Sequence, residues 1–213
     1  MEIDRREALR YLGYGRQEAD RETGALLEEC IGELLREADC RHVVREFLLF
    51  EASDGRLDCG CFYTESRGLR TNLSGCERVL IMAATLGSGA DRLIFRWEKR
   101  SMAKAVVLQA AAAAMIEAYC NELCAGWKRE YEERGLYLRP RFSPGYGDFP
   151  LTVQQRLLDG IDAGKRIGIT LTDGGLMLPS KSVTAVIGAG KQPVSCGAAG
   201  CEACGKVDCA YRR

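Results

Sequence analysis

One loop of the sequence combines a fixed backbone path with side chains that could hold a small polar ligand. It reads Arg-Phe-Ser-Pro-Gly-Tyr-Gly-Asp-Phe-Pro over residues 141–150. Its prolines fix the backbone, and its glycines permit tight turns or the close approach of a ligand. Arg141 offers a planar fork of donors, Tyr146 an aromatic face, and Asp148 a carboxylate. This composition is typical of a ligand-binding loop, although an ordered turn between a strand and a helix would read the same way.

A carboxylate stands out within the longest helical stretch of the sequence. The helical pattern covers residues 101–134 and includes a run of alanines over 110–114, which predicts close packing. Glu117 follows this apolar run, where a carboxylate needs a partner. One suitable partner is the ammonium group of a ligand. Cys120 and Cys124 share a face of the same helix, and we expect them to be small buried residues rather than ligands.

The last part of the chain has a different composition. We expect one domain over residues 1–190 and a cysteine-rich tail over 191–213. The tail holds closely spaced thiols among glycines and has little apolar content. These thiols belong to Cys196, Cys201, Cys204 and Cys209. Four thiolates suit a tetrahedral zinc ion or an iron–sulfur cluster, while redox-active or merely reduced thiols are the alternatives.

The elements that must position these groups are helices and strands in irregular order. Helical patterns occur over 4–14, 20–38, 101–134 and 151–162, and strand patterns over 43–50, 57–64, 77–86, 167–172 and 176–187. Turn signals at Asp54-Gly55 and at 173–175 join neighbouring strands as hairpins. Because helices and strands do not alternate regularly, we predict an α+β fold. It should contain a twisted, largely antiparallel sheet with packed helices.

Two short features are weaker candidates for chemistry. Gly87-Ser88-Gly89 lies between a strand and a helix, but the third glycine of a dinucleotide-binding turn is missing, so a tight turn is expected. His42 is the only histidine, and no Cys/His or Ser/His pair is convincing. We therefore predict no catalytic residue.

Bulk composition excludes several classes of protein. The 213 residues include 30 basic and 30 acidic side chains, so no basic excess favours nucleic acid as a partner. No continuous run of about 18 apolar residues suggests a membrane span. The charged N-terminal residues do not resemble a secretory signal. Eleven cysteines without such a signal favour reduced thiols and a cytoplasmic location.

The loop and the segment after it resemble the activation domain of cobalamin-dependent methionine synthase. Arg141-x-x-Pro144-Gly145-Tyr146-x-x-x-Pro150 is similar to the signature of that family. Two motifs follow in the family's order and spacing: Lys165-x-x-Gly168-Ile169-x-Leu171-Thr172 and Met177-x-Pro179-x-x-Ser182-Val183. The similarity covers residues 139–190, and residues 5–15 more loosely resemble the start of small free-standing relatives.

The resemblance implies a site for S-adenosylmethionine. Arg141 would hold the α-carboxylate, Glu117 would be the helix acid that contacts the ligand, and Tyr146 would lie near the sulfonium or the ribose. Backbone groups over 143–145 would recognise the adenine. The implied binding residues are Glu117, Arg141, Ser143, Pro144, Gly145 and Tyr146. The family also uses an acid from an N-terminal element, which the sequence alone does not place.

The resemblance also implies a function and partners. In the family, cobalamin carried by the partner is reactivated by reductive methylation, with S-adenosylmethionine as the methyl donor. The partner would be a cobalamin-binding methionine synthase or another corrinoid protein, and the electron would come from a flavodoxin-like or ferredoxin-like donor. Whether the chain is itself an enzyme stays open. The alternatives are a methyltransferase that acts on another acceptor and a non-enzymatic metabolite-sensing or metal-binding module.

Overall fold

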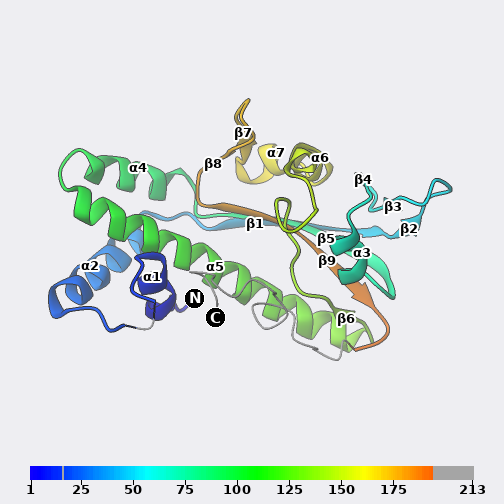
Figure 1. Cartoon of the computed structure of the whole chain (residues 1–213), viewed down its shortest axis with the longest axis horizontal. Helices are drawn as coiled ribbons and strands as arrows, with labels where there is room; N and C mark the ends of the chain where they lie inside the picture. Colours follow the sequence, from blue (N-terminus) through cyan, green and yellow to red (C-terminus); the bar gives the residue numbers. More distant parts are fainter. Residues whose placement is uncertain (16, 194–213) are drawn as a thin grey trace.

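The computed structural model describes residues 1–15 and 17–193. A four-stranded antiparallel sheet lies at its centre, with the strand order β1-β5-β9-β6 (Figure 1). The strands are β1 (Arg41–Leu48), β5 (Cys76–Thr85), β6 (Tyr137–Leu138) and β9 (Ser182–Gly190). The predicted α+β fold with a largely antiparallel sheet is therefore confirmed.

The central strand β5 divides the core in two. Successive side chains of a strand point to opposite faces. Accordingly, Leu80 and Met82 belong to one buried cluster, and Val79 and Ile81 belong to another. Both faces of the sheet are thus covered, which explains why β5 reads as a nearly continuous apolar run.

Four helices cover the first face of the sheet. They are α1 (Arg5–Tyr11), α2 (Arg21–Glu37), α4 (Ser88–Glu98) and α5 (Met102–Glu133). Figure 1 shows α5 running along the whole group. Asp20 caps α2 by accepting a hydrogen bond from the Thr23 amide at 2.8 Å, and Ser101 caps α5. The predicted long helix is confirmed, with Ser101 just before its first residue.

The alanine run of α5 is closely packed, as predicted, in the core between the sheet and the neighbouring helices. Four of its members are buried: Ala110, Ala111, Ala112 and Ala114. By length and composition alone, α5 would be long and apolar enough to cross a membrane. Its buried face accounts for that composition, since small residues allow the helix to approach the strands closely.

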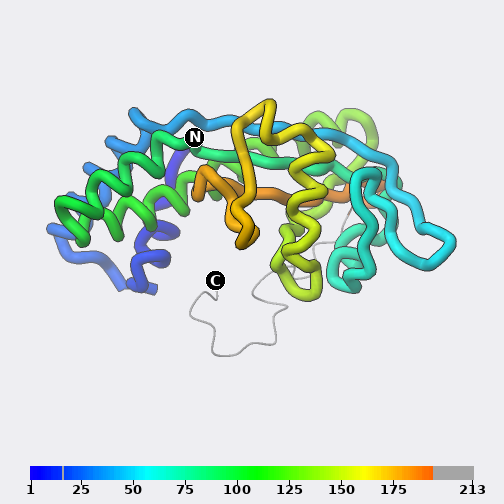
Figure 2. Tube along the Cα trace, turned by 90° about the horizontal axis from the view of Figure 1, so that it is seen from above, coloured from blue at the N-terminus to red at the C-terminus, as the bar shows by residue number. Residues whose placement is uncertain are grey.

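The second face carries shorter elements. These are the helices α3 (Arg67–Asn72), η1 (Leu151–Val153), α6 (Gln154–Gly160) and α7 (Ala163–Ile167), and the strands β2 (Phe50–Glu51), β3 (Leu57–Asp58), β4 (Tyr63–Thr64), β7 (Thr170–Leu171) and β8 (Met177–Leu178). Figure 2 looks down on this side, where the segment from α6 to β8 crosses in front of the strands. Strands β2, β3 and β4 form one small sheet, and β7 pairs with β8 in the predicted hairpin.

Two predictions made from the sequence are wrong in this second layer. Ile167 was expected in an alternating strand, but it is the buried last residue of α7. Gly168, at φ +74°, ends that helix in the left-handed conformation, so the strand β7 begins only at Thr170. Cys59 and Cys61 follow the short strand β3 instead of extending it.

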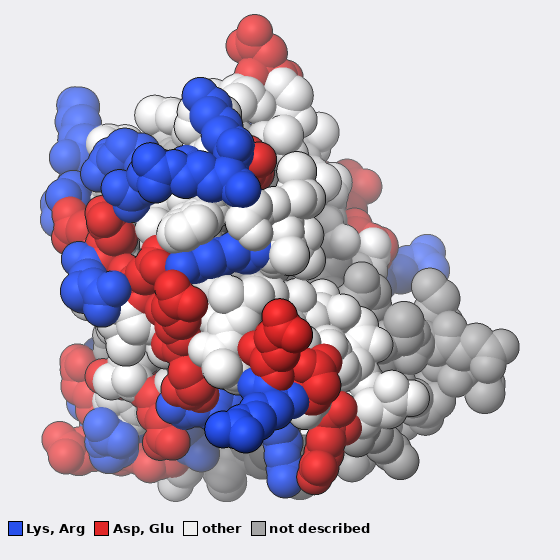
Figure 3. Space-filling model, turned by 90° about the vertical axis from the view of Figure 1, so that its left-hand side faces the viewer, with Lys and Arg blue, Asp and Glu red and all other residues white. Residues whose placement is uncertain are grey.

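Opposite charges are interspersed on the end of the molecule that Figure 3 shows. Ion pairs join the helices of the first face, as with Arg96 and Glu37 at 3.1 Å and Lys104 and Glu33 at 2.7 Å. The balanced composition of the sequence is therefore matched by a mixed surface at this end. The tail cysteines Cys196, Cys201, Cys204 and Cys209 lie outside the described residues.

Candidate ligand-binding site

The loop predicted to bind a ligand is fastened to strand β9. The Arg139 amide donates to the carbonyl of Gly188 at 2.8 Å, and Phe142 and Val186 exchange two backbone hydrogen bonds of 2.9 Å. Upstream, Leu138 pairs with Ala189. The step from Leu138 to Phe142 therefore spans one residue more than the facing step from Ala189 to Val186. The loop strand is bulged at this point, as expected where Pro140 cannot donate to the ladder.

The bulge determines which side chains face α5. Leu138 packs with the core cluster on the helix face, whereas Phe142 packs with the cluster on the opposite face. Neighbouring residues of an extended chain point in opposite directions. Arg141 is accordingly turned toward α5, where the predicted partner Glu117 lies.

Arg141 and Glu117 form an ion pair in the structure. Nη2 of Arg141 donates to Oε2 of Glu117 at 2.9 Å and to Oδ1 of Asn121 at 2.9 Å. The side chains of Arg141 and Glu117 are 20% and 34% exposed, so both charges remain within reach of a ligand from solvent. Charge-assisted hydrogen bonds of this kind are stronger than hydrogen bonds between neutral groups. The structure thus brings together the two residues on which the predicted site depends most.

Two cysteines lie beneath the Arg141 guanidinium on the same helix face. Burial raises the pKa of Cys120 to about 12, and it also raises the pKa of Cys124, with the positive charge of Arg141 as a smaller opposing effect. Both thiols are therefore neutral at neutral pH. Cys120 is fully buried, as predicted from its spacing, and Cys124 is partly buried.

The rest of the loop forms a compact turn. The Gly145 amide donates to the Phe149 carbonyl at 2.7 Å, and the Tyr146 amide donates to the Ser143 carbonyl at 3.1 Å. Gly145 and Gly147 have φ values of +88° and +57°, a conformation that L side chains rarely adopt. The glycines therefore make the tight turn that their spacing predicted.

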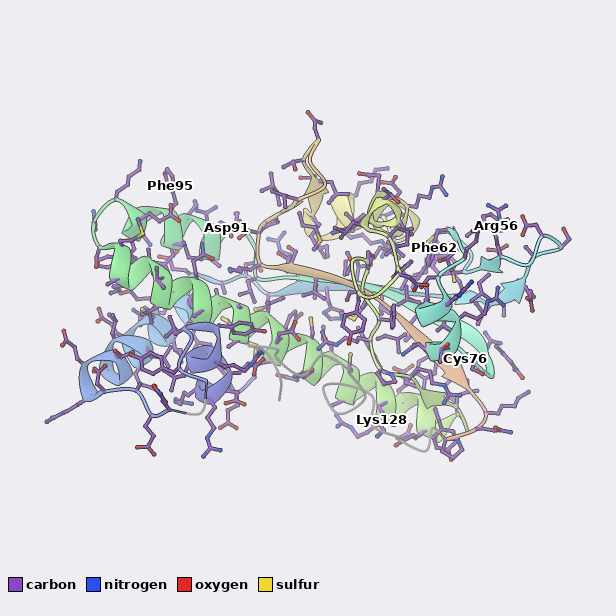
Figure 4. All side chains as sticks on the ribbon, viewed as in Figure 1. Arg56, Phe62, Cys76, Asp91, Phe95 and Lys128 are labelled. Atoms are coloured by element: carbon purple, nitrogen blue, oxygen red, sulfur yellow. The ribbon has the colours of Figure 1, made fainter. Side chains whose placement is uncertain are left out.

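Aromatic side chains anchor this turn to the second core. Phe149 is buried, and its ring centroid lies 5.8 Å from that of Phe62 (labelled in Figure 4) and 6.1 Å from that of Phe142. Tyr146 stays 62% exposed and meets the Phe142 ring edge-on at 5.4 Å. In this structure Tyr146 thus contacts Phe142, and its exposed face is open to a ligand or a partner.

Asp148 has a structural role that was not predicted from the sequence. It accepts hydrogen bonds from the Ser66 hydroxyl at 2.5 Å and from the amides of Arg67 and Gly68 at 2.7 and 3.0 Å. These bonds hold the pKa of Asp148 below its usual value, with the Ser66 hydroxyl as the largest cause. The carboxylate thereby ties the loop to the first turn of α3.

A surface hollow of about 330 Å³ adjoins the loop beside Asp148. Its remaining lining residues are Arg56, Tyr63, Thr64, Glu65, Ser66, Pro150 and Val153. Arg56, which is labelled in Figure 4, has its guanidinium 5.0 Å from the centroid of the Tyr63 ring and pairs with Asp54. The hollow extends the surface around the loop on the side of the second layer.

Helix α1 also reaches the site, which the sequence did not predict. Burial raises the pKa of Tyr11, and the negative charges of Glu7 and Glu117 raise it further. Tyr11 therefore lies close enough to Glu117 to sense its charge. Asn121 was missed as well, although its position one turn beyond Glu117 was a usable signal.

No metal centre occurs in the part of the chain that the structure describes. Within residues 1–15 and 17–193, no three His, Cys, Asp or Glu side chains are grouped so that they could hold a metal ion. The predicted metal ligands of the tail lie beyond this range.

Comparison with known proteins gives a match to a family and a match to a solved structure. Residues 71–202 match the family described as vitamin B12 dependent methionine synthase, activation domain. The crystal structure of the MetH reactivation domain bound to AdoHcy superposes with a TM-score of 0.61 at 20% identity, covering 82% of this chain and 68% of that chain. At that identity the likeness shows the fold alone. No curated protein matches the sequence.

The family match includes both Glu117 and the loop over 141–150, and it ends inside the predicted tail. It covers more than half of the chain and agrees with the resemblance found over residues 139–190. This chain belongs to the family of vitamin B12-dependent methionine synthase activation domains.

Proposed function

We propose that this chain binds S-adenosylmethionine and supports the reductive methylation of a cobalamin held by a partner protein. The partner is a cobalamin-binding methionine synthase or a related corrinoid methyltransferase, and the chain acts on it in trans in the cytoplasm. The observation that carries the proposal is the Arg141–Glu117 pair beside the family's loop.

The pair suits the α-amino acid end of S-adenosylmethionine. That end carries a carboxylate and an ammonium group side by side. Arg141 takes the carboxylate and Glu117 takes the ammonium, so each ligand charge meets a protein charge of opposite sign. The AdoHcy bound to the structural neighbour contains the same amino acid end, which supports this assignment.

The rest of the loop provides contacts for the remainder of the ligand. Backbone groups of Ser143, Pro144 and Gly145 recognise the adenine, and the exposed Tyr146 ring lies near the sulfonium or the ribose. A cation is attracted to the face of an aromatic ring. Because Tyr146 is 62% exposed, the methyl group can point outward to a docked partner.

The chain contributes binding and orientation rather than acid–base chemistry. Reduced cobalt of the partner's corrinoid supplies the nucleophile that accepts the methyl group. One electron is required from a flavodoxin-like or ferredoxin-like donor, and S-adenosylhomocysteine is released. The exposed Tyr146 and the neighbouring hollow form the face on which the partner docks.

A reactivation assay tests the proposal. An oxidatively inactivated corrinoid methyltransferase from the same source is mixed with this chain, a low-potential electron donor and S-adenosylmethionine labelled in the methyl group. We expect loss of the cob(II)alamin absorption and label on cobalt only when all components are present. Label on another protein or a small molecule without any corrinoid would instead establish a direct methyltransferase.

Binding without any turnover under reducing conditions would favour the metabolite-sensing alternative. Calorimetry with S-adenosylmethionine separates this outcome from a failure to bind at all. A chain that binds neither S-adenosylmethionine nor S-adenosylhomocysteine would contradict the proposed function.

A further inference from the structure

The guanidinium of Arg141 donates hydrogen bonds to two side chains of α5, which lie one helical turn apart. Glu117 and Asn121 lie at positions i and i+4, so their side chains share one face of the helix. Both accept from the same nitrogen, Nη2, at 2.9 Å. Asn121 is neutral and exposed, and neither the family loop nor the charge pattern of the sequence pointed to it.

The number of hydrogens on Nη2 limits what this arrangement allows. That nitrogen carries two hydrogens, enough for one hydrogen bond to each of its two acceptors. A carboxylate bound through two parallel hydrogen bonds engages either Nε with Nη2 or Nη1 with Nη2. Each mode needs one hydrogen of Nη2. A ligand carboxylate bound to Arg141 in the bidentate manner would therefore be a third acceptor on Nη2, unless Glu117 or Asn121 gives up its hydrogen bond.

The charges indicate which acceptor leaves. If Glu117 leaves, the ligand carboxylate replaces it on Arg141, and the ligand ammonium gives Glu117 a new partner. Every charge then stays paired. If Asn121 gives up its hydrogen bond instead, Glu117 and the ligand carboxylate both bind the same guanidinium. Glu117 is then not available to pair with the ligand ammonium. Like charges held that close are unfavourable.

We infer that Asn121 is a positioning residue that holds the Arg141 guanidinium against α5 while Glu117 is exchanged for the carboxylate of the bound ligand. This inference rests on the proposed function. The neutral amide suits the task, because it accepts a hydrogen bond without competing as an anion. An acid at this position would instead give Arg141 a permanent negative partner. The inference predicts that Asn121 affects only ligands that carry the amino acid group.

The test compares two ligands on the whole chain by titration calorimetry. S-Adenosylhomocysteine carries the α-amino acid group, whereas 5′-methylthioadenosine keeps the adenosine and the thioether but lacks that group. We expect Asn121→Ala to weaken binding of the first ligand by about two- to tenfold, the range for one hydrogen bond, and to leave the second unchanged. Asn121→Asp should weaken binding of the first ligand more than Asn121→Ala does.

Gln109→Ala is the matched control, because Gln109 is an exposed amide on the same helix. It should change the affinity for neither ligand. Equal losses for both ligands in Asn121→Ala would show a general effect on the fold and overturn the inference. Wild-type affinity for S-adenosylhomocysteine in Asn121→Asp would overturn it too. If the wild-type chain does not bind S-adenosylhomocysteine, the proposed function itself fails, which is a different result.

Discussion

Arg141 and Glu117 are 24 positions apart in the sequence, and the structure joins them through a hydrogen bond of 2.9 Å between Nη2 and Oε2. In the free protein, the two charges that we propose to bind the ligand are therefore paired with each other. On binding of a zwitterion, the ion pair between Arg141 and Glu117 would be replaced by two pairs, Arg141 with the ligand carboxylate and Glu117 with the ligand ammonium. Each charge would thus keep a partner of opposite sign. The predictions below begin with this pair.

Removal of Arg141 should abolish most of the affinity for the ligand. Arg141→Ala leaves the ligand carboxylate without a partner, and truncating one side of such a charge pair costs about 2–5 kcal/mol of binding free energy. Calorimetry with S-adenosylhomocysteine measures this loss. Arg156→Ala, which removes an exposed arginine on α6, is the control and should bind normally. An unchanged affinity in Arg141→Ala would exclude Arg141 from the site.

Arg141 and Glu117 should also be coupled in the stability of the free protein. A double-mutant cycle with Arg141→Ala and Glu117→Gln should give a coupling of about 0.5–1 kcal/mol in the free energy of unfolding, because both side chains are only partly exposed. Arg5 and Glu28 form a matched pair that is 52% and 53% exposed, and their coupling should be smaller. Denaturant titrations of the variants provide the measurement. Additive effects at Arg141 and Glu117 would show that the pair is not maintained in solution.

The anchoring of the loop by Asp148 should depend on pH. Because hydrogen bonds lower the pKa of Asp148 in the folded state, its contribution to stability is present above the ordinary carboxyl pKa and is lost as the pH falls through the folded value. Asp148→Asn should therefore lower the thermal midpoint at neutral pH, and the difference from wild type should shrink in strong acid. Thermal melts across this pH range would show it. A difference that does not change with pH would mean that the charge of Asp148 has no role.

Gly68 should be intolerant of a side chain. A Cβ at this position would lie 3.0 Å from Oδ1 of Asp148 and 3.1 Å from Cζ of Phe142. Both neighbours are held in place, so Gly68→Ala should cost about 1–3 kcal/mol of unfolding free energy. Gly24→Ala in α2 is the control, since its Cβ meets nothing within 4 Å, and it should stabilise the protein by about 0.5–1 kcal/mol. A Gly68→Ala variant as stable as wild type would indicate that the loop shifts easily.

The tail prediction can be tested without structural information. Cys196, Cys201, Cys204 and Cys209 should hold one zinc ion or one iron–sulfur cluster per chain after anaerobic purification. Metal and sulfide analysis would detect either, and replacing the four cysteines by serine should abolish the signal. Finding neither, with all four thiols freely alkylated, would contradict the prediction.

Local signals in the sequence predicted the parts of the fold that local physics determines. The helical patterns over 20–38 and 101–134 predicted α2 and α5, and the structure shows that Asp20 and Ser101 cap these helices. Ile167 was misread, since a short helix that ends at Gly168 looks like an alternating strand over a few residues.

The site was predictable only in part for a similar reason. The charges of Arg141 and Glu117 identified them as candidates in the sequence. The roles of Asp148 and Asn121 depend on partners far away in the chain, at Ser66 and at Arg141. Spacing within one element cannot reveal such partners. The tertiary arrangement was needed to separate the residue that anchors the loop from the residues that we propose to face the ligand.

The bulge between Leu138 and Phe142 lets this segment carry one extra residue without changing the direction in which Arg141 points. Deleting one residue there, for example Pro140, would let the chain pair with β9 without the offset. Leu138 would still lie opposite Ala189 and Phe142 opposite Val186, so Arg141 would still point toward α5. Insertions between Gly147 and Phe149 would leave that orientation unchanged, because Phe142 is already bonded to Val186 upstream. Among homologues, loss of the extra residue before Phe142 and length variation after Gly147 should therefore both be compatible with the orientation of Arg141.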